Sequence, residues 1–195
     1  MQIFWEIEVT DNTLAVDSEF LAICSAMSSE GGKEPTGISY GVTTNGQVIT
    51  VGNTGYEPVL AIRSAATYKG DPNVVVARLK SFGLYSDDDI SYRLVWFPDT
   101  VTGGTWVPRG GNSSIEYNVN PTSITGGQIL DEDFIDATDT GSKKQGQSIE
   151  DVLSQQEVVC RTADNQGSLM MVLLAKSEAG TSTVKASMKW VEDIG

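Results

Sequence analysis

The amino-acid sequence predicts an all-β protein, built as an antiparallel β-sandwich or a jelly-roll-like form of one. Apolar residues alternate with polar residues in many short runs, as they do along strands that bury one face. Glycine, proline and asparagine separate these runs as turns, and no segment has a convincing long helical period. We expect a single sandwich domain over residues 1–195, in which residues 1–55 are open to a second interpretation as a β-hairpin extension of a main sandwich at 56–195.

The pattern is clearest where every second residue from Ile90 to Trp96 is apolar. This alternation predicts a strand with one buried face and with Ser91 and Arg93 facing water. A glycine-rich loop that carries Trp106 follows, and it leads to a return strand at Ile115–Tyr117.

Similar runs predict strands along the rest of the chain. They lie at Ile3–Val9, Ile38–Val42, Val48–Val51, Val59–Arg63, Asn73–Ser86, Ile129–Ile135, Val158–Cys160 and Leu169–Ala175. Phe20–Met27 fits both a capped helix and a strand, and we favour a strand because its neighbours are strands. Asn45-Gly46 between two apolar runs predicts a type I′ hairpin, since both residues tolerate positive φ. In residues 73–86, apolar side chains occupy both alternating sets of positions, which indicates that parts of this strand are buried on both faces.

The last predicted strand alternates most regularly. Its apolar side chains should be buried and its lysines Lys185 and Lys189 exposed, with Val184, Ala186, Met188 and Trp190 on the buried face. We expect it to pair antiparallel with Leu169–Ala175, because only a short turn separates the two strands.

Composition excludes several classes of function. The chain has 26 acidic and 13 basic residues, a net charge of −13 and a pI near 4.2, which argues against nucleic acid and anionic membrane surfaces as partners. No apolar run approaches the roughly 20 residues that a membrane span needs, so no membrane insertion is expected. Histidine is absent, which removes Ser-His-Asp and Cys-His catalysis and every histidine metal site. The absence of histidine and the lack of a convergent polar site lead us to expect no enzyme, no cofactor and no metal.

The two cysteines, Cys24 and Cys160, are far apart in the sequence and form no CxxC unit. They can pair only if the fold brings their Cα atoms to about 4.4–6.8 Å. We favour two buried thiols, because an unpaired cysteine behaves as a small hydrophobe.

Two acidic clusters are candidate calcium or glycosidase groups. They comprise Asp87–Asp89 and Asp131–Asp133, the second extended by Asp136 and Asp139. Calcium takes several carboxylate oxygens, but the EF-hand spacing is missing here. A glycosidase needs two carboxylates about 5–10 Å apart, a condition that some pair among so many acids will always meet. We favour solvated turns.

Aromatic residues offer a second kind of site, because flat rings beside polar groups can bind sugars. Tyr68, Trp96, Trp106 and Tyr117 are the candidates. Trp96 lies on the apolar face of its strand, so we expect it in the core. Trp106 lies between glycine-rich turns, and we take Trp106, Tyr117 and Asn112 as candidate contacts for a glycan or a partner protein.

Several motifs occur in an order that resembles one protein family. They are Trp5–Ile7, Ile23–Gly32, Pro58–Arg63, Phe97–Trp106, Ser114–Asn118, Thr125–Gly127 and Val184–Glu192. This series is similar to that of a family of structural proteins from tailed, podovirus-like bacteriophages, and it covers nearly the whole chain. Members usually carry an upstream segment, so the chain is expected to be a shortened member or the C-terminal part of one. Ala26-Met27 departs from the β-branched residues common in the family.

The resemblance implies a non-enzymatic virion protein that acts in assembly or surface display, as a head decoration, fibre or tail-adhesion module. Its partners would be other virion proteins, with a host surface glycan as a further candidate. Phage surface modules usually repeat about a symmetry axis, so we expect a trimer or a higher symmetric ring. The alternative is a carbohydrate-binding or carbohydrate-active phage protein that uses Trp106 and nearby acids.

Overall fold

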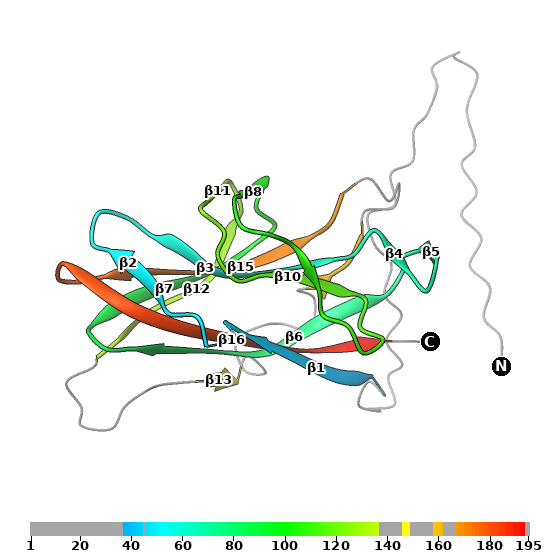
Figure 1. Cartoon of the computed structure of the whole chain (residues 1–195), viewed down its shortest axis with the longest axis horizontal. Coiled ribbons are helices and arrows are strands. Elements are labelled where there is room, and N and C mark those ends of the chain that lie inside the picture. Colours follow the sequence, from blue (N-terminus) through cyan, green and yellow to red (C-terminus); the bar gives the residue numbers. More distant parts are fainter. Residues whose placement is uncertain (1–36, 45, 137–145, 149–157, 162–166, 194–195) are drawn as a thin grey trace, which may run out of the picture.

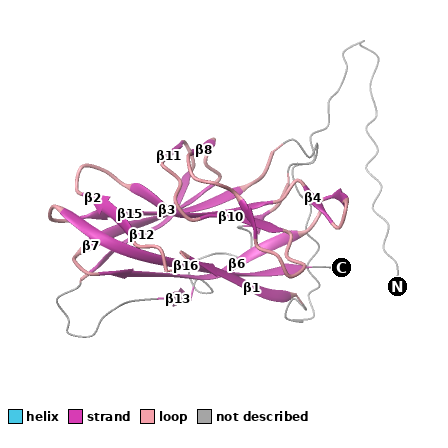
Figure 2. Ribbon diagram, viewed as in Figure 1, coloured by secondary structure: helices cyan, strands magenta, loops and turns pink. Residues whose placement is uncertain are grey.

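The structure is a computed structural model that describes residues 37–44, 46–136, 146–148, 158–161 and 167–193. All regular elements in these residues are strands, most of them in two six-stranded antiparallel sheets (Figure 2). The predicted all-β sandwich class is confirmed. The strand expected at Ile3–Val9, the ambiguous segment Phe20–Met27 and Cys24 lie outside the described residues. The described part contains no helix that could cross a membrane.

The first sheet is built around its long last strand, and its members are β1 (Ile38–Thr43), β2 (Ile49–Gly52), β6 (Val76–Ser86), β13 (Gly146–Ser148), β14 (Val158–Val159) and β16 (Thr181–Asp193). β16 pairs with β6 along one edge and with β1 and β2 along the other. β13 and β14 both pair with the far edge of β6.

The second sheet has the order β12-β7-β15-β3-β10-β9. These strands span Gln128–Ile135, Ile90–Trp96, Met170–Ser177, Glu57–Ser64, Ile115–Asn118 and Val107–Pro108. Two small ribbons complete the fold, β8 (Thr100–Thr102) with β11 (Ser123–Thr125), and β4 (Thr67–Tyr68) with β5 (Asp71–Pro72). Figure 1 shows the sheets as two layers, with β8 and β11 on the outer side of the second sheet.

The second sheet is buried on both faces near its centre. Its inner face packs on the first sheet in the main core, which includes Leu60, Leu94 and Leu173. A smaller cluster covers the outer face, where Ala61, Val95, Val172 and Leu174 meet Tyr56, Val101, Trp106 and Ile124. Burial on both faces explains why the sequences of β3 and β15 are continuously apolar instead of alternating.

The burial predicted for the last strand is confirmed, but the predicted pairing with Leu169–Ala175 is wrong. Val184, Ala186, Met188 and Trp190 are buried, and Lys185 and Lys189 are exposed. However, β15 pairs with β3 and β7 in the second sheet, whereas β16 lies in the first. Both edges of β15 are already occupied, so the turn after Ser177 carries the chain across to the facing sheet.

The hairpin expected at Asn45-Gly46 is also wrong. β1 and β2 are both antiparallel to β16 and therefore run in the same direction along one of its edges. The N–H of Thr44 donates to the carbonyl of Ala186 over 2.9 Å, and the N–H of Gln47 donates to the carbonyl of Thr44 over 2.9 Å. The first bond holds Thr44 beside β16, and β2 pairs with the same strand again from Ile49 onward, so the chain does not reverse.

Two smaller expectations need correction, and a third is confirmed. Ser91 and Arg93 do not face water as predicted. Ser91 is buried, and its hydroxyl donates a hydrogen bond of 2.5 Å to the Glu178 carboxylate, whereas Arg93 is half-buried. Residues 73–86 are not buried on both faces, because Val74 is 86% exposed and buried residues alternate with more exposed ones along β6, except at Lys80-Ser81, where the pairing with β16 shifts register. The return strand predicted at Ile115–Tyr117 is present as β10, which runs antiparallel to β7 in the same sheet, with β15 and β3 between them.

Candidate binding site

The structure places two of the candidate contact residues on opposite faces of the second sheet. Trp106 is half-buried on the outer face, where the guanidinium of Arg63 lies 4.2 Å from its ring centroid. Arg63 also forms an ion pair of 2.7 Å with Glu116, so one face of the indole is covered by a fixed cation. Tyr117 packs instead against the main core on the inner face.

The third candidate, Asn112, lies in the loop between β9 and β10 with a φ of +66°. Its carbonyl accepts a hydrogen bond of 3.0 Å from the hydroxyl of Tyr68. This backbone contact belongs to the turn, and it ties the loop to β4. The structure therefore does not bring Trp106, Tyr117 and Asn112 together into one site.

The first acidic cluster has a structural role at a turn. Asp87 accepts hydrogen bonds from the Thr183 hydroxyl at 2.5 Å and from the Thr183 N–H at 2.7 Å. These bonds hold the pKa of Asp87 below its usual value, the hydroxyl bond being the largest cause. The carboxylate thereby fastens the β6–β7 turn to β16.

Two carboxylates of the second acidic cluster also accept hydrogen bonds within the fold. The Tyr92 hydroxyl donates to Asp131 over 3.1 Å, and burial followed by the Asp131 charge raises the pKa of Tyr92. Glu132 accepts hydrogen bonds of 2.9 Å from both Arg93 and Tyr56, and these bonds lower the pKa of Glu132. Asp139 lies outside the described residues. Where the chain is described, no group of three or more acidic or cysteine side chains could hold a metal ion.

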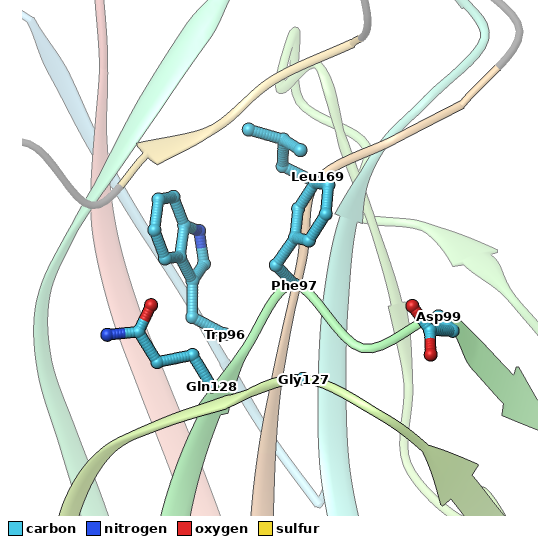
Figure 3. Close-up of a pocket in the computed structure, with 6 residues that line it drawn as sticks. All are labelled: Trp96, Phe97, Asp99, Gly127, Gln128 and Leu169. Atoms are coloured by element: carbon cyan, nitrogen blue, oxygen red, sulfur yellow. The ribbon is translucent and has the colours of Figure 1, made fainter.

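A hollow of about 400 Å³ opens where β7, β12 and β15 meet (Figure 3). Its lining comprises Trp96, Phe97, Asp99, Gly127, Gln128 and Leu169. The rings of Trp96 and Phe97 have centroids 6.2 Å apart and planes inclined by 57°. Gln128 lies beside Trp96, whereas Asp99 lies on the other side of Phe97.

Local backbone geometry builds this hollow. Phe97 follows the last residue of β7 with a φ of +58°, and its N–H donates to the carbonyl of Met170 over 2.9 Å. Gly127 has a φ of +95°, and a Cβ there would lie 2.5 Å from Val95 and 3.1 Å from the backbone of Pro98. Only glycine permits the start of β12 to approach this closely.

The sequence indicated only part of this site. Trp96 packs against the main core as expected, yet it is half-buried and also lines the hollow. Phe97, Asp99 and Gln128 carry no sequence pattern that predicts a site. The sequence feature that points to the site is the aromatic pair Trp96-Phe97 before Pro98. Successive side chains of a strand point to opposite faces, so the same core cannot bury both rings.

No protein-family model matches the chain, and no curated protein matches it in sequence. Cys160 is buried, as expected, and its carbonyl accepts a hydrogen bond of 2.8 Å from the N–H of Leu169.

Proposed function

We propose that this chain is a non-enzymatic structural module of a bacteriophage virion that acts in assembly or surface display. The ordered series of motifs along the sequence carries the proposal. The positions of three of these motifs in the described part of the fold support it, because they belong to strands of the two main sheets. Pro58–Arg63 belongs to β3, Ser114–Asn118 includes β10, and Val184–Glu192 belongs to β16.

The contacts of the motif residues also favour a structural role. Ile62 is fully buried in the main core, and Arg63 pairs with Glu116 across β3 and β10. Trp190 and Glu192 are fully buried in the last strand. Arg63, Glu116 and Glu192 thus make structural contacts, whereas a catalytic motif would present such groups toward a cleft.

The proposal is tested on particles of the phage that encodes the chain. Purified virions are separated into heads and tails, and each fraction is analysed by mass spectrometry and by immunogold labelling with antibodies to this chain. We expect several copies in one fraction and labelling at regular positions on the particle. A chain that is abundant in the infected cell and missing from purified particles would contradict the proposal.

A further inference from the structure

We propose that the hollow at Trp96 and Phe97 binds a neutral saccharide. The proposal concerns the isolated chain and does not depend on a virion location. A hollow of about 400 Å³ falls within the size range of small-molecule sites, roughly 300–1,000 Å³. Such sites are mostly apolar and carry a few polar groups that orient the ligand, which is the composition found here.

The aromatic pair supplies the apolar surface. Phe97 is 49% exposed, Trp96 is half-buried, and both line the hollow with their ring planes inclined by 57°. Leu169, which is only 5% exposed, forms part of the lining behind these rings. A pyranose ring presents a flat face of C–H groups, which can be buried against such rings while its hydroxyls remain at the rim.

The rim supplies groups that suit hydroxyls. The side chains of Asp99 and Gln128 are exposed and flank the aromatic pair on opposite sides (Figure 3). A carboxylate accepts several hydrogen bonds, and an amide both donates and accepts them. Sugar hydroxyls also do both, so each side chain can bind a hydroxyl at its own side of the hollow.

Charge selects against anionic ligands. The lining described for the hollow contains Asp99 and no lysine or arginine, and the chain carries a net charge of −13. A phosphate or a uronate would meet repulsion without a cation to offset it. The site therefore fits a neutral hexose or N-acetylhexosamine.

The backbone at Phe97 supports a binding role independently. A φ of +58° is unusual for a bulky residue and is unfavourable unless other contacts enforce it. The bond from its N–H to Met170 fixes this conformation and keeps the ring at the hollow. Strained residues of this kind concentrate at ligand sites.

The test is calorimetric titration of the whole chain with maltose, cellobiose, lactose and N,N′-diacetylchitobiose, with glucose 6-phosphate as an anionic comparison. We expect at least one neutral disaccharide to bind and the sugar phosphate not to bind. Phe97→Ala should weaken binding at least about tenfold, a loss typical of a removed central contact. Gln128→Ala and Asp99→Asn should each weaken it less.

Two variants separate loss of the site from loss of the fold. Phe97→Gly removes the ring and relieves the positive φ, so binding should be lost while the thermal midpoint stays the same or rises. Tyr85→Ala removes an aromatic ring that is 38% exposed on the other sheet, and it should bind as the unmodified chain does. The proposal is overturned if none of the four neutral disaccharides binds, if Phe97→Ala binds normally, or if glucose 6-phosphate binds more tightly than they do.

Discussion

The indole N–H of Trp190 donates a hydrogen bond of 2.8 Å to the carboxylate of Glu192, and both side chains are fully buried. Glu192 also accepts bonds from the N–H of Ser114, at 2.7 Å, and from the hydroxyl of Ser113. The last strand thereby holds the loop between β9 and β10 against the end of the sandwich. Three donors converge on one buried carboxylate, which satisfies most of its acceptor sites.

We expect Glu192→Ala to lower the free energy of unfolding by at least about 3 kcal/mol, because it leaves buried donors without an acceptor. Glu192→Gln retains one acceptor oxygen and should cost less, about 1–2 kcal/mol. Urea denaturation measures both values. Glu116→Ala is the control, since its partner Arg63 is partly exposed and the loss should be about 1 kcal/mol or less. Equal losses for Glu192→Ala and Glu116→Ala would refute the special role of Glu192.

Trp190→Ala should destabilise the protein by about 3–5 kcal/mol, because the indole is 1% exposed and its removal leaves a large cavity. This is a large part of a typical domain stability of about 5–15 kcal/mol, so we expect poor soluble expression. Lys189→Ala should change the urea midpoint little, because its side chain faces water. A normal urea midpoint for Trp190→Ala would show that the indole is not part of the core.

The sequence revealed the buried face of β16 because alternation is a local property of the chain. It did not reveal the partner of this strand, because pairing depends on residues far away. The short turn after Ser177 suits a hairpin equally well, and only the occupation of both edges of β15 by β3 and β7 excludes one. Likewise, Asn45-Gly46 has the composition of a hairpin turn, but Thr44 is bonded to Ala186 and keeps the chain beside β16.

The hollow was harder to predict than the sheets. Trp96 follows the alternation of its strand, and this pattern predicts a core position. The indole does pack against the main core, but it also lines the hollow. The position of Phe97 depends on a positive φ that its residue type disfavours, so propensity argues against the observed geometry. Gln128 and Leu169 reach the site from β12 and from the start of β15, a juxtaposition that only the tertiary fold creates.

Gly127→Ala should lower the thermal midpoint markedly. A Cβ at this position lies 2.5 Å from the Val95 side chain and 3.1 Å from the Pro98 backbone, so the two segments must move apart. Gly70→Ala is a matched control, because Gly70 has the same φ of +95° with nothing within 4 Å of its Cβ position. The difference between the two variants isolates the steric effect from backbone strain, and similar midpoints would show that the contact yields easily.

Acid should destabilise the protein in part through Asp87. The bonds from Thr183 hold the folded-state pKa of Asp87 below its unfolded value. Its stabilising contribution is therefore complete above the unfolded pKa of about 4 and is lost as the pH falls through the lower folded value. Thr183→Val removes the hydroxyl donor, so NMR titration should show a higher pKa for Asp87, and stability should depend less on pH between about 5 and 2. An unchanged pKa in this variant would assign the shift to another contact.

Self-association should depend on β12, which is an edge strand of the second sheet. Phe134 is 70% exposed and Ile129 is 45% exposed on this strand, and no described strand pairs with its outer edge. An open edge with exposed apolar side chains favours contact with another chain. We expect light scattering to give a trimer or larger ring for the unmodified chain and a lower mass for Phe134→Glu, because the added carboxylate would be buried in the interface. Val74→Glu, at an 86% exposed position outside the sheets, should leave the mass unchanged. A monomer mass for the unmodified chain at tens of micromolar would contradict self-association in solution, and an unaltered oligomer in Phe134→Glu would exclude β12 as the contact.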